Sequence, residues 1–595
     1  MASSSVSPEP LDVLQDSDND DGGNNLSGLE DEDNDEEIMD LDEDDSADES
    51  DDDEWHTPPA KKPHESAQSK SPLAWKTPED TDVAPPTIRF RPARPPGVQL
   101  NPADTHTPLE LFKLFFSPDV VATLCQNTNK QAAKNIEQGG KYKWTALTVD
   151  ELYKYIGLIF YMGLIKLDHI QDYWRQNNIF SIAFPGMVMT RDRYRTISWN
   201  VHMSDPDEDQ ENDIRRGTPQ YDRLFRVKPL MDQIREACKT FYHPQRNLAV
   251  DERMVATKAK TGMTQYMKRK PTKWGFKLFV MADSSNGYTV DFAVYTGKGG
   301  SYTGKGSSYT GQGISYDTVM SFMDHSFLGS GYHVYMDNFY TSPKLFRDLH
   351  AQKFGACGTY RDKKKDCKDG LSTMLNALDR TSRRGDFRWI RDGPLVFVKW
   401  MDAQEVSVCS TIHAAFNGET IQRKVKTPKG TWDTQTFSCP TPVLKYNEHM
   451  GGVDLSDQLI QYYTTQHKTM KWYRKLFLHF LDIAATNAYI LHKELASQQL
   501  RDALTHKAFI EELTAQLCGM SQKIPSKRAS CDHVPVPVAK LSRDVRQVAS
   551  QGRRTCVLCR LQRSKKHNTP WKCSKCDVPL CLQLTRNCFG EWHCN

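Results

Sequence analysis

Helical periodicity dominates the first folded stretch of the chain. Apolar residues recur at three- and four-residue intervals through residues 147–167 and 191–203, which is typical of amphipathic helices. Thr107 and Glu110 form a capping-box pattern with proline at the first helical position, so a helix is expected to begin there. We therefore predict a helical domain over residues 105–246.

Short apolar runs replace the helical pattern after residue 246. Four runs bounded by turn residues predict strands, and a fifth run follows a helix that begins with a Ser-Pro pair. The runs cover residues 247–250, 277–282, 288–295, 332–336 and 354–359, and the helix begins at Ser342. The predicted order is βββαβαβ, so we expect a multidomain α/β protein.

A threefold heptad repeat, YTGKGGS, YTGKGSS and YTGQGIS, lies at residues 295–315. Residues 299–305 match the start of a phosphate-binding P-loop, GxxxxGK, but Gly306 stands where the motif needs Ser or Thr. A glycine-rich loop made by tandem duplication explains the pattern equally well. We interpret the repeat as a loop and not as a nucleotide site.

The net charge of +1 conceals a segregation of charge along the chain. Residues 1–54 hold 24 of the 76 Asp and Glu residues and no Lys or Arg, so the remainder carries a net charge of +25. An acidic segment with so few apolar residues cannot bury enough surface to fold, and we expect it to be disordered. The basic remainder favours a polyanionic partner, with nucleic acid as the leading class.

The longest apolar run, residues 155–165, has about eleven residues and is shorter than the roughly 20 that a membrane-spanning helix needs. No apolar segment opens the chain, so the sequence predicts neither a membrane protein nor a secreted one. A length of 595 residues indicates several domains.

Two acidic residues end apolar strands of the predicted sheet. Asp251, with Glu252 beside it, follows the segment NLAV, and Asp337 follows the segment HVYM. Carboxylates at the ends of neighbouring strands project toward one edge of a sheet, where loops leave room for a substrate. Each residue taken singly is equally compatible with a solvated loop position.

A third acidic pair follows a Gly-Gly step in the segment YNEHMGGVDLSDQ. Asp454 and Asp457 lie three residues apart, on one face of a predicted helix, and ordinary capping with Asp454 as N-cap is the alternative. Carboxylates from Asp251, Asp337 and Asp454 within about 4 Å would repel by roughly 4 kcal/mol per pair at an effective dielectric near 20. Such a cluster needs cations.

Oxygen ligands alone suit Mg²⁺ or Mn²⁺, and two such ions about 3.5 to 4 Å apart serve phosphodiester chemistry. Basic residues interleaved with aromatics flank the acidic segments, which is typical of phosphate contacts and base stacking. A solvated basic face with a few core aromatics is the alternative. The candidate DNA-contact residues are Lys268, Arg269, Lys270, Lys273, Lys471, Trp472, Arg474 and Lys475.

Metal-ligand spacing is concentrated in the last forty residues, which hold seven of the fifteen cysteines. Two CxxC pairs and the donors that follow them suffice for two tetrahedral zinc sites, interleaved along the chain. Disulfides are the alternative, but the lack of a secretory signal favours a reducing compartment and zinc. The candidate ligands are Cys556, Cys559, Cys573, Cys576, Cys581, Cys588, His593 and Cys594, with their pairing open and His567 as a substitute.

Residues 521–595 carry 15 Lys and Arg against 4 Asp and Glu, so the Cys-rich module has a strongly basic setting. We expect it to contact DNA, because neutralising phosphates releases counterions. Protein or histone-tail binding is the competing interpretation.

The sequence resembles the piggyBac family of DNA transposases from about residue 107 to the C-terminus. The shared motifs, in order, are VDE at Asp251, YMDNFYTS around Asp337, FGACGT, YNEHMGGVDLSDQ around Asp454, KWYRK and the terminal Cys/His module. The resemblance implies an RNase H-like core with catalytic aspartates at Asp251, Asp337 and Asp454, and Asp457 at a further required acidic position. Trp472 matches a family tryptophan that is placed to stack near the flipped or hairpin end.

The resemblance also implies a DDD-type, metal-dependent cut-and-paste reaction. Its steps are nicking at the 3′ ends of terminal inverted repeats, hairpin formation on the transposon ends, and insertion at TTAA. A homodimer and recognition of the terminal repeats by a cross-brace zinc module are implied as well. A nuclear location is expected from the DNA substrate, with basic clusters at Lys527-Arg528, Arg553-Arg554 and Lys565-Lys566 as import candidates. A domesticated, non-catalytic DNA- or chromatin-binding protein is the alternative.

The expected domains follow the order of these motifs. They are a disordered acidic head and Pro-rich linker (1–104), a helical dimerisation and DNA-binding domain in two parts (105–246 and 464–545), a catalytic core in two parts (247–372 and 435–463), an inserted β-rich domain (373–434) and a Cys-rich zinc-binding domain (553–595).

Overall fold

The computed structural model of the protein describes most of the chain from residue 75 onward. The described residues are 75–176, 182–268, 270–297, 310–360, 378, 381–427, 430–469, 471–520, 533–538, 552–562, 566–583 and 586–593. The acidic head, Arg269, Cys594 and most of the heptad repeat lie outside these ranges, so what we expect of them stays a prediction.

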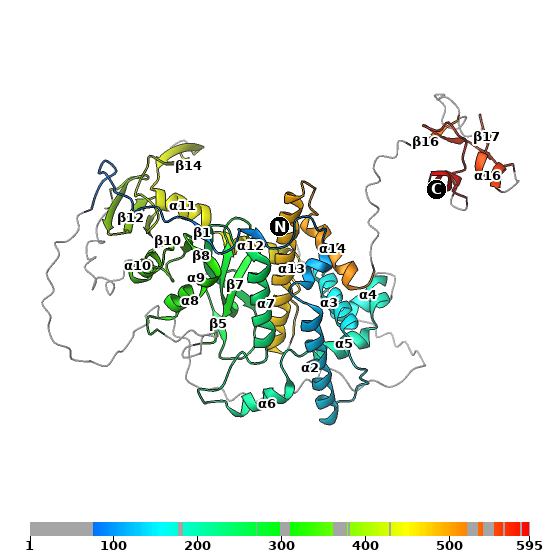
Figure 1. Ribbon diagram of the computed structural model, residues 1–595, viewed down its shortest axis with the longest axis horizontal. Coiled ribbons are helices and arrows are strands. Elements are labelled where there is room, and N and C mark those ends of the chain that lie inside the picture. The colour runs from blue at the N-terminus through cyan, green and yellow to red at the C-terminus, as the bar shows by residue number, and fades with distance from the viewer. Residues whose placement is uncertain are drawn as a thin grey trace, which may run out of the picture. The chain divides into compact units, whose positions relative to one another are not determined.

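Helices on both sides of the sheet region in sequence form the helical part of the protein (Figure 1). The predicted capping box is confirmed, because Thr107 Oγ1 accepts the Glu110 N–H at 3.2 Å and the Glu110 carboxylate accepts the Thr107 N–H at 2.7 Å. The elements are α1 (Pro108–Lys113), α2 (Pro118–Glu137), α3 (Val149–Leu164), η1 (Ile170–Trp174), α4 (Ala183–Val188), α5 (Arg191–Asn200), α6 (Pro206–Ile214), α7 (Lys228–Phe241), α13 (Trp472–Gln498) and α14 (His506–Leu517).

Helix α13 joins the helical part to the sheet. It is buried on nearly all sides and contacts α1, α7, α14 and strand β4 (Asn247–Ala256). Its Asn487 side chain accepts the N–H of Thr289 at 3.0 Å and donates to the Thr289 carbonyl at 2.9 Å, as a neighbouring strand would. Among the described residues, no helix is long and apolar enough to cross a membrane.

The central sheet contains nine strands within the described residues, in the order β11-β12-β13-β10-β9-β4-β6-β5, with β7 also paired to β6. Strands β4, β6 and β7 are antiparallel neighbours, whereas β9 runs parallel to both β4 and β10. The remaining bounds are β5 (Thr264–Tyr266), β6 (Trp274–Asp283), β7 (Thr289–Val294), β9 (His333–Met336), β10 (Gly355–Thr359), β11 (Phe387–Asp392), β12 (Leu395–Met401) and β13 (Glu405–Ser410).

Helices separate the parallel strands, as the predicted order requires. Between β7 and β9 lie α8 (Ile314–Phe322) and α9 (His325–Leu328), and between β9 and β10 lies α10 (Pro343–Ala351). The five predicted strands and the order βββαβαβ are confirmed, with the short strands β5 and β8 as additions. The prediction that the first strand ends at Asp251 is wrong, because β4 stays paired with β6 as far as Ala256.

The segment predicted as an inserted β-rich domain, residues 373–434, continues the central sheet. Strand β13 pairs antiparallel with β10, so β11, β12 and β13 extend that sheet at one edge. Their aromatic residues form a second core cluster there, in which Phe387, Trp389 and Trp400 are fully buried. A separate hairpin of β14 (Thr420–Lys426) and β15 (Trp432–Ser438) follows. Helices α11 (Thr441–His449) and α12 (Gly452–Tyr462) then bring the chain back to strands β4, β6 and β10.

The Pro-rich segment that we expected to be a linker is bound to the folded core from residue 75 onward. Arg391 donates two hydrogen bonds of 2.6 Å to the Asp82 carboxylate, which also accepts the Ala415 N–H at 2.7 Å. Further along, β1 (Arg91–Pro92) pairs with β8 (Gly329–Ser330), and β2 (Gly97–Val98) pairs with β3 (Tyr242–His243).

The C-terminal module is a small fold of short elements. Strand β16 pairs with β19, and β17 pairs with β18. Residues 533–538 therefore belong to the module, although they precede its predicted start at residue 553. The elements are β16 (Pro535–Pro537), β17 (Arg554–Thr555), α16 (Val557–Gln562), β18 (Asn568–Thr569), β19 (Trp571–Cys573) and α17 (Cys588–His593).

Candidate active site and metal centres

Parallel pairing of β4 with β9 brings two of the predicted aspartates together. Val250 lies opposite Met336 in this ladder, and Asp251 and Asp337 are the next residue on each strand. The two side chains therefore leave the sheet at the same edge, and each offers a carboxylate oxygen within 4.8 Å of the other. The Asp251 side chain is only 14% exposed.

The third carboxylate of this group is Glu252, which sequence reasoning did not select. Oxygen atoms of Asp251, Glu252 and Asp337 all lie within 4.8 Å of one another. Glu252 is 4% exposed, and among the described residues its Oε1 accepts no hydrogen bond, although Lys277 Nζ lies 3.2 Å away. We refer to these three residues as the carboxylate group.

The electrostatics of the carboxylate group call for a cation. Burial raises the pKa of Asp251 to about 7, with Lys270 opposing the shift and Glu252 adding to it. Burial also raises the pKa of Asp337, again with a contribution from Glu252. Buried oxygen donors with an unsatisfied Glu252 oxygen fit Mg²⁺ or Mn²⁺, which take oxygen ligands.

Lys270, predicted as a DNA contact, lies against the carboxylate group. Its Nζ is 3.3 Å from Asp251 Oδ2 and donates to the Glu252 carbonyl at 3.0 Å. Burial alone would lower the pKa of Lys270, but Asp251 and Glu252 raise it, and Asp454 acts in the same direction. Asp454 is exposed and lies outside the carboxylate group.

Helix α12, which carries Asp454, packs closely on the sheet. It begins at Gly452, with Gly451 as N-cap, so Asp454 stands in the first turn and is not the N-cap. A Cβ at Gly452 would lie 3.0 Å from Ser284 Cα and 3.1 Å from Ala249 Cβ. The predicted close approach at the Gly-Gly step is confirmed for Gly452.

Asp457, the further acidic position, is bound to a buried arginine. Arg253 of β4 is 3% exposed, and its Nε donates to Asp457 Oδ1 while its Nη2 donates to Ser456 Oγ at 2.7 Å. Asp457 therefore ties α12 to β4 and does not contact the carboxylate group in this arrangement. We interpret Asp457 as a positioning residue.

Two basic residues between β5 and β6 lie on an exposed surface, unlike Lys270. Lys268 and Lys273 are exposed, and the rings of Tyr266 and Trp274 lie 4.9 Å apart beside them. Trp274 is 51% exposed. Their role as DNA contacts stays a prediction.

The residues of the KWYRK motif are half-buried where α13 begins, except Tyr473, which is buried. Trp472 packs edge-on against Phe276 at 6.0 Å. Lys471 donates to the Trp199 carbonyl at 3.3 Å, and Lys475 donates to the His467 carbonyl. Arg474 is likewise half-buried, so this group contributes to packing as well as to charge.

Four cysteines of the C-terminal module form one candidate metal centre. Their sulfur atoms all lie within 4.8 Å of one another, and Cys559 Sγ is 3.5 Å from Cys588 Sγ and 4.0 Å from Cys581 Sγ. All four thiols are free and buried. The set is Cys556, Cys559, Cys581 and Cys588, which fits a tetrahedral Cys₄ zinc site.

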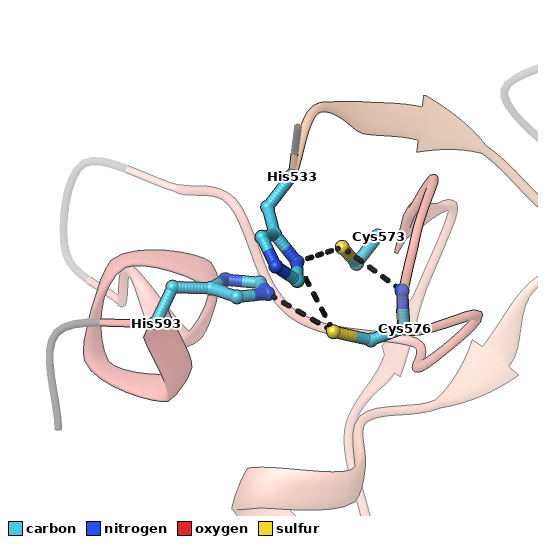
Figure 2. Close-up of side chains that lie close together, drawn as sticks. All are labelled: His533, Cys573, Cys576 and His593. Atoms are coloured by element: carbon cyan, nitrogen blue, oxygen red, sulfur yellow. Dashed lines mark hydrogen bonds between the residues drawn. The ribbon is translucent and has the colours of Figure 1, made fainter. Parts of the chain in front are cut away.

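A second candidate centre combines two cysteines with two histidines (Figure 2). His533 Nδ1 is 3.2 Å from both Cys573 Sγ and Cys576 Sγ, and His593 Nε2 is 3.6 Å from Cys576 Sγ. The Phe589 carbonyl lies 2.8 Å from His593 Nδ1, and such a bond leaves Nε2 as the ligand atom. This set fits a Cys₂His₂ zinc site.

The two centres alternate along the chain, as the sequence predicted, but His533 was missed. Pairing of β16 with β19 sets Pro535 opposite Cys573 and so brings the upstream histidine to the second centre. His567, the predicted substitute, belongs to neither centre. The alternating segment HVPVPV that opens with His533 is the sequence signal for this strand.

Comparison with known proteins identifies the family. The model of the family described as Transposase IS4, which covers piggyBac-type transposases, matches residues 107–489, well over half of the chain. Two similar relatives in Homo sapiens are PiggyBac transposable element-derived protein 3 and protein 2. The first is 25% identical over 508 residues, 82% of this chain and 76% of the relative, and the second is 26% identical over 413 residues, 68% and 64% respectively.

A solved structure shares the fold. It is the cryo-EM structure of a piggyBac transposase synaptic complex with hairpin DNA, with a TM-score of 0.58 and 21% identity, covering 82% of this chain and 98% of that one. The chain belongs to the piggyBac-type transposase family.

Replacing Asp457 with alanine should loosen α12 because it leaves the buried Arg253 without its charged partner. We expect hydrogen exchange in α12 to rise about thirtyfold, which corresponds to about 2 kcal/mol of local stability. Asp454→Ala is the matched control on the same helix, and its exchange should change less than about twofold. Equal effects of the two substitutions would contradict the positioning role of Asp457.

Replacing His533 with alanine should remove one of two bound zinc ions. With three ligands left, the second centre should release its metal to a weak chelator, and metal analysis should find one zinc per chain instead of two. His567→Ala should retain both ions. Retention of two ions by His533→Ala would mean that another residue completes the second centre.

Proposed function

We propose that this protein is a cut-and-paste DNA transposase that cleaves and joins DNA strands at the carboxylate group. The observation that carries the proposal is the meeting of Asp251, Glu252 and Asp337, whose carboxylate oxygens all lie within 4.8 Å of one another and could hold a metal ion. The arrangement of strands β4, β6, β7, β9 and β10 supports an RNase H-like description of this core.

The residues of the site have two roles, metal binding and positioning. Asp251 and Asp337 would hold Mg²⁺ or Mn²⁺, two ions in the full site, with Asp454 as the third acidic ligand. Such ions, when bound, polarise the phosphodiester and offset the charge that develops on its oxygens. Glu252 keeps the neighbouring lysines close, and the ion pair of Arg253 with Asp457 fixes the helix that carries Asp454.

Lys270 and Lys277 extend the site toward an anionic substrate. Each lies within 3.3 Å of a carboxylate oxygen of the group, so their charges are balanced without DNA. Lys268 and Lys273, exposed beside Tyr266 and Trp274, offer phosphate contacts and aromatic surface on the same β5–β6 connection.

We extend the proposal to the reaction steps and the assembly. By resemblance to the piggyBac family, the proposal includes terminal inverted repeats as substrate, hairpin ends, insertion at TTAA and a homodimer. A nuclear location is proposed because the substrate is DNA. These steps are supported by the shared fold, because the similar structure is that of a piggyBac transposase in a synaptic complex with hairpin DNA. The zinc module, with two Zn²⁺ in its Cys₄ and Cys₂His₂ centres, would recognise the terminal repeats.

A second candidate function is a domesticated DNA- or chromatin-binding protein without catalysis. It is favoured by the human relatives, which are transposable element-derived proteins. It would keep the zinc module and the basic surfaces, and it would have no need of the carboxylate group.

The test is strand cleavage by the purified full chain on a duplex that carries the element's own terminal repeat. We expect Mg²⁺-dependent nicking at the 3′ end, and a loss of at least a thousandfold in rate with Asp251→Asn or Asp337→Asn, while binding persists. Asp119→Asn, at an exposed position on α2, is the matched control and should cleave like the wild type. Binding without cleavage by the wild type would instead establish the second candidate.

A further inference from the structure

The hairpin of β14 and β15 stands apart from the central sheet. Its strands pair over seven positions, from Thr420 opposite Ser438 to Lys426 opposite Trp432. An isolated two-stranded hairpin is marginally stable in water, so one face needs support from the rest of the protein. The two faces of this ribbon differ accordingly.

One face of the ribbon is anchored. Ile421 and Phe437 lie opposite each other, and Ile421 packs against the second core cluster. The Arg384 guanidinium stands over the Phe437 ring at 5.6 Å. Arg423, on the same face, donates to Asp402 at 3.2 Å. These contacts hold the ribbon and neutralise the charge of this face.

The other face is open and carries only cationic, neutral polar and aromatic side chains. Every residue on it is exposed, and Trp432 is 68% exposed. Asp433 lies opposite Val425 and so belongs to the anchored face. We define the open face by its residues, which are Thr420, Gln422, Lys424, Lys426, Trp432, Thr434, Thr436 and Ser438.

The chemistry of the open face fits double-stranded DNA. Two ammonium groups, on Lys424 and Lys426, share the face with hydroxyl and amide groups, and all of these donate to phosphate oxygens. No carboxylate on this face competes for the two lysines. A two-stranded ribbon fits the major groove, which is about 12 Å wide, and an exposed indole adds apolar or stacking contact.

We propose that the open face of the β14–β15 ribbon is a DNA-binding arm, with Lys424 and Lys426 on the phosphate backbone and Trp432 against the sugar or base surface. The inference rests on the proposed function, because it supplies that function with a duplex contact away from the carboxylate group. It assigns a role to the part of the inserted segment that does not extend the central sheet.

The test is binding of the full chain to a fluorescent duplex of about 30 base pairs of mixed sequence, measured over a range of salt concentrations. Lys424→Ala combined with Lys426→Ala should make the slope of log K against log salt shallower by about 2, because each lost phosphate contact removes roughly 0.9. Trp432→Ala should weaken binding at least fivefold and leave the slope unchanged.

Two controls separate a local contact from a change in net charge. Lys344→Ala combined with Lys445→Ala removes two lysines that each lie within 2.8 Å of a carboxylate oxygen, and it should leave the slope unchanged. Lys424→Arg combined with Lys426→Arg should keep the wild-type slope and so exclude misfolding as the cause.

Three outcomes would overturn the proposal. Salt-dependent binding by the wild type with an unchanged slope in the ribbon variant would overturn the DNA-binding arm and leave the proposed function intact. An equal change of slope in the variant with Lys344→Ala and Lys445→Ala would mean that the effect comes from the net charge of the protein and not from the open face. If the variant with Lys424→Ala and Lys426→Ala bound the duplex normally but bound a peptide of residues 30–54 more weakly than the wild type does, the partner of the open face would be an acidic protein segment.

Discussion

The parallel register between β4 and β9 is the constraint on which the site depends. It sets Val250 opposite Met336 and thereby places Asp251 and Asp337 side by side where both strands leave the ladder. A shift of one residue would move one of them to the other face of the sheet, because the side-chain period of a strand is two. The buried apolar strands that enforce this register thus also define the chemistry.

Three consecutive residues of β4, from Asp251 to Arg253, have different roles in the site. Asp251 and Glu252 supply oxygen atoms, while Arg253 is bound to α12 through Asp457 and Ser456. These partners hold the buried arginine through its Nε and Nη2, while its Nη1 has no hydrogen-bond partner among the described residues. The ion pair with Asp457 fixes the helix on which Asp454 stands. Negative charge is concentrated at the edge, and Lys270 and Lys277 offset part of it. Burial, with a smaller contribution from the charge of Glu252, raises the pKa of Asp251 to about 7.

Much of the core was predictable because its strands contain short apolar runs that are followed by acidic residues. Asp337 follows its strand as predicted, whereas β4 continues past Asp251 to Ala256, and the meeting of the two residues required only that the strands be neighbours. Glu252 was not predictable, since adjacent residues on a regular strand point to opposite faces. The pairing of β13 with β10 is a long-range choice of partner that local pattern does not encode. His533 reaches its centre through the same kind of pairing, between β16 and β19, outside any CxxC spacing.

Excision of the element from a plasmid in cells, using its own end sequences, would show whether the carboxylate group is catalytic. We expect the wild type to restore a single TTAA at the donor site and Asp337→Asn to fail to do so. Excision that persists in Asp337→Asn would contradict the carboxylate group as the catalytic centre. Absence of excision by either protein, with binding to the ends intact, would contradict the transposase assignment.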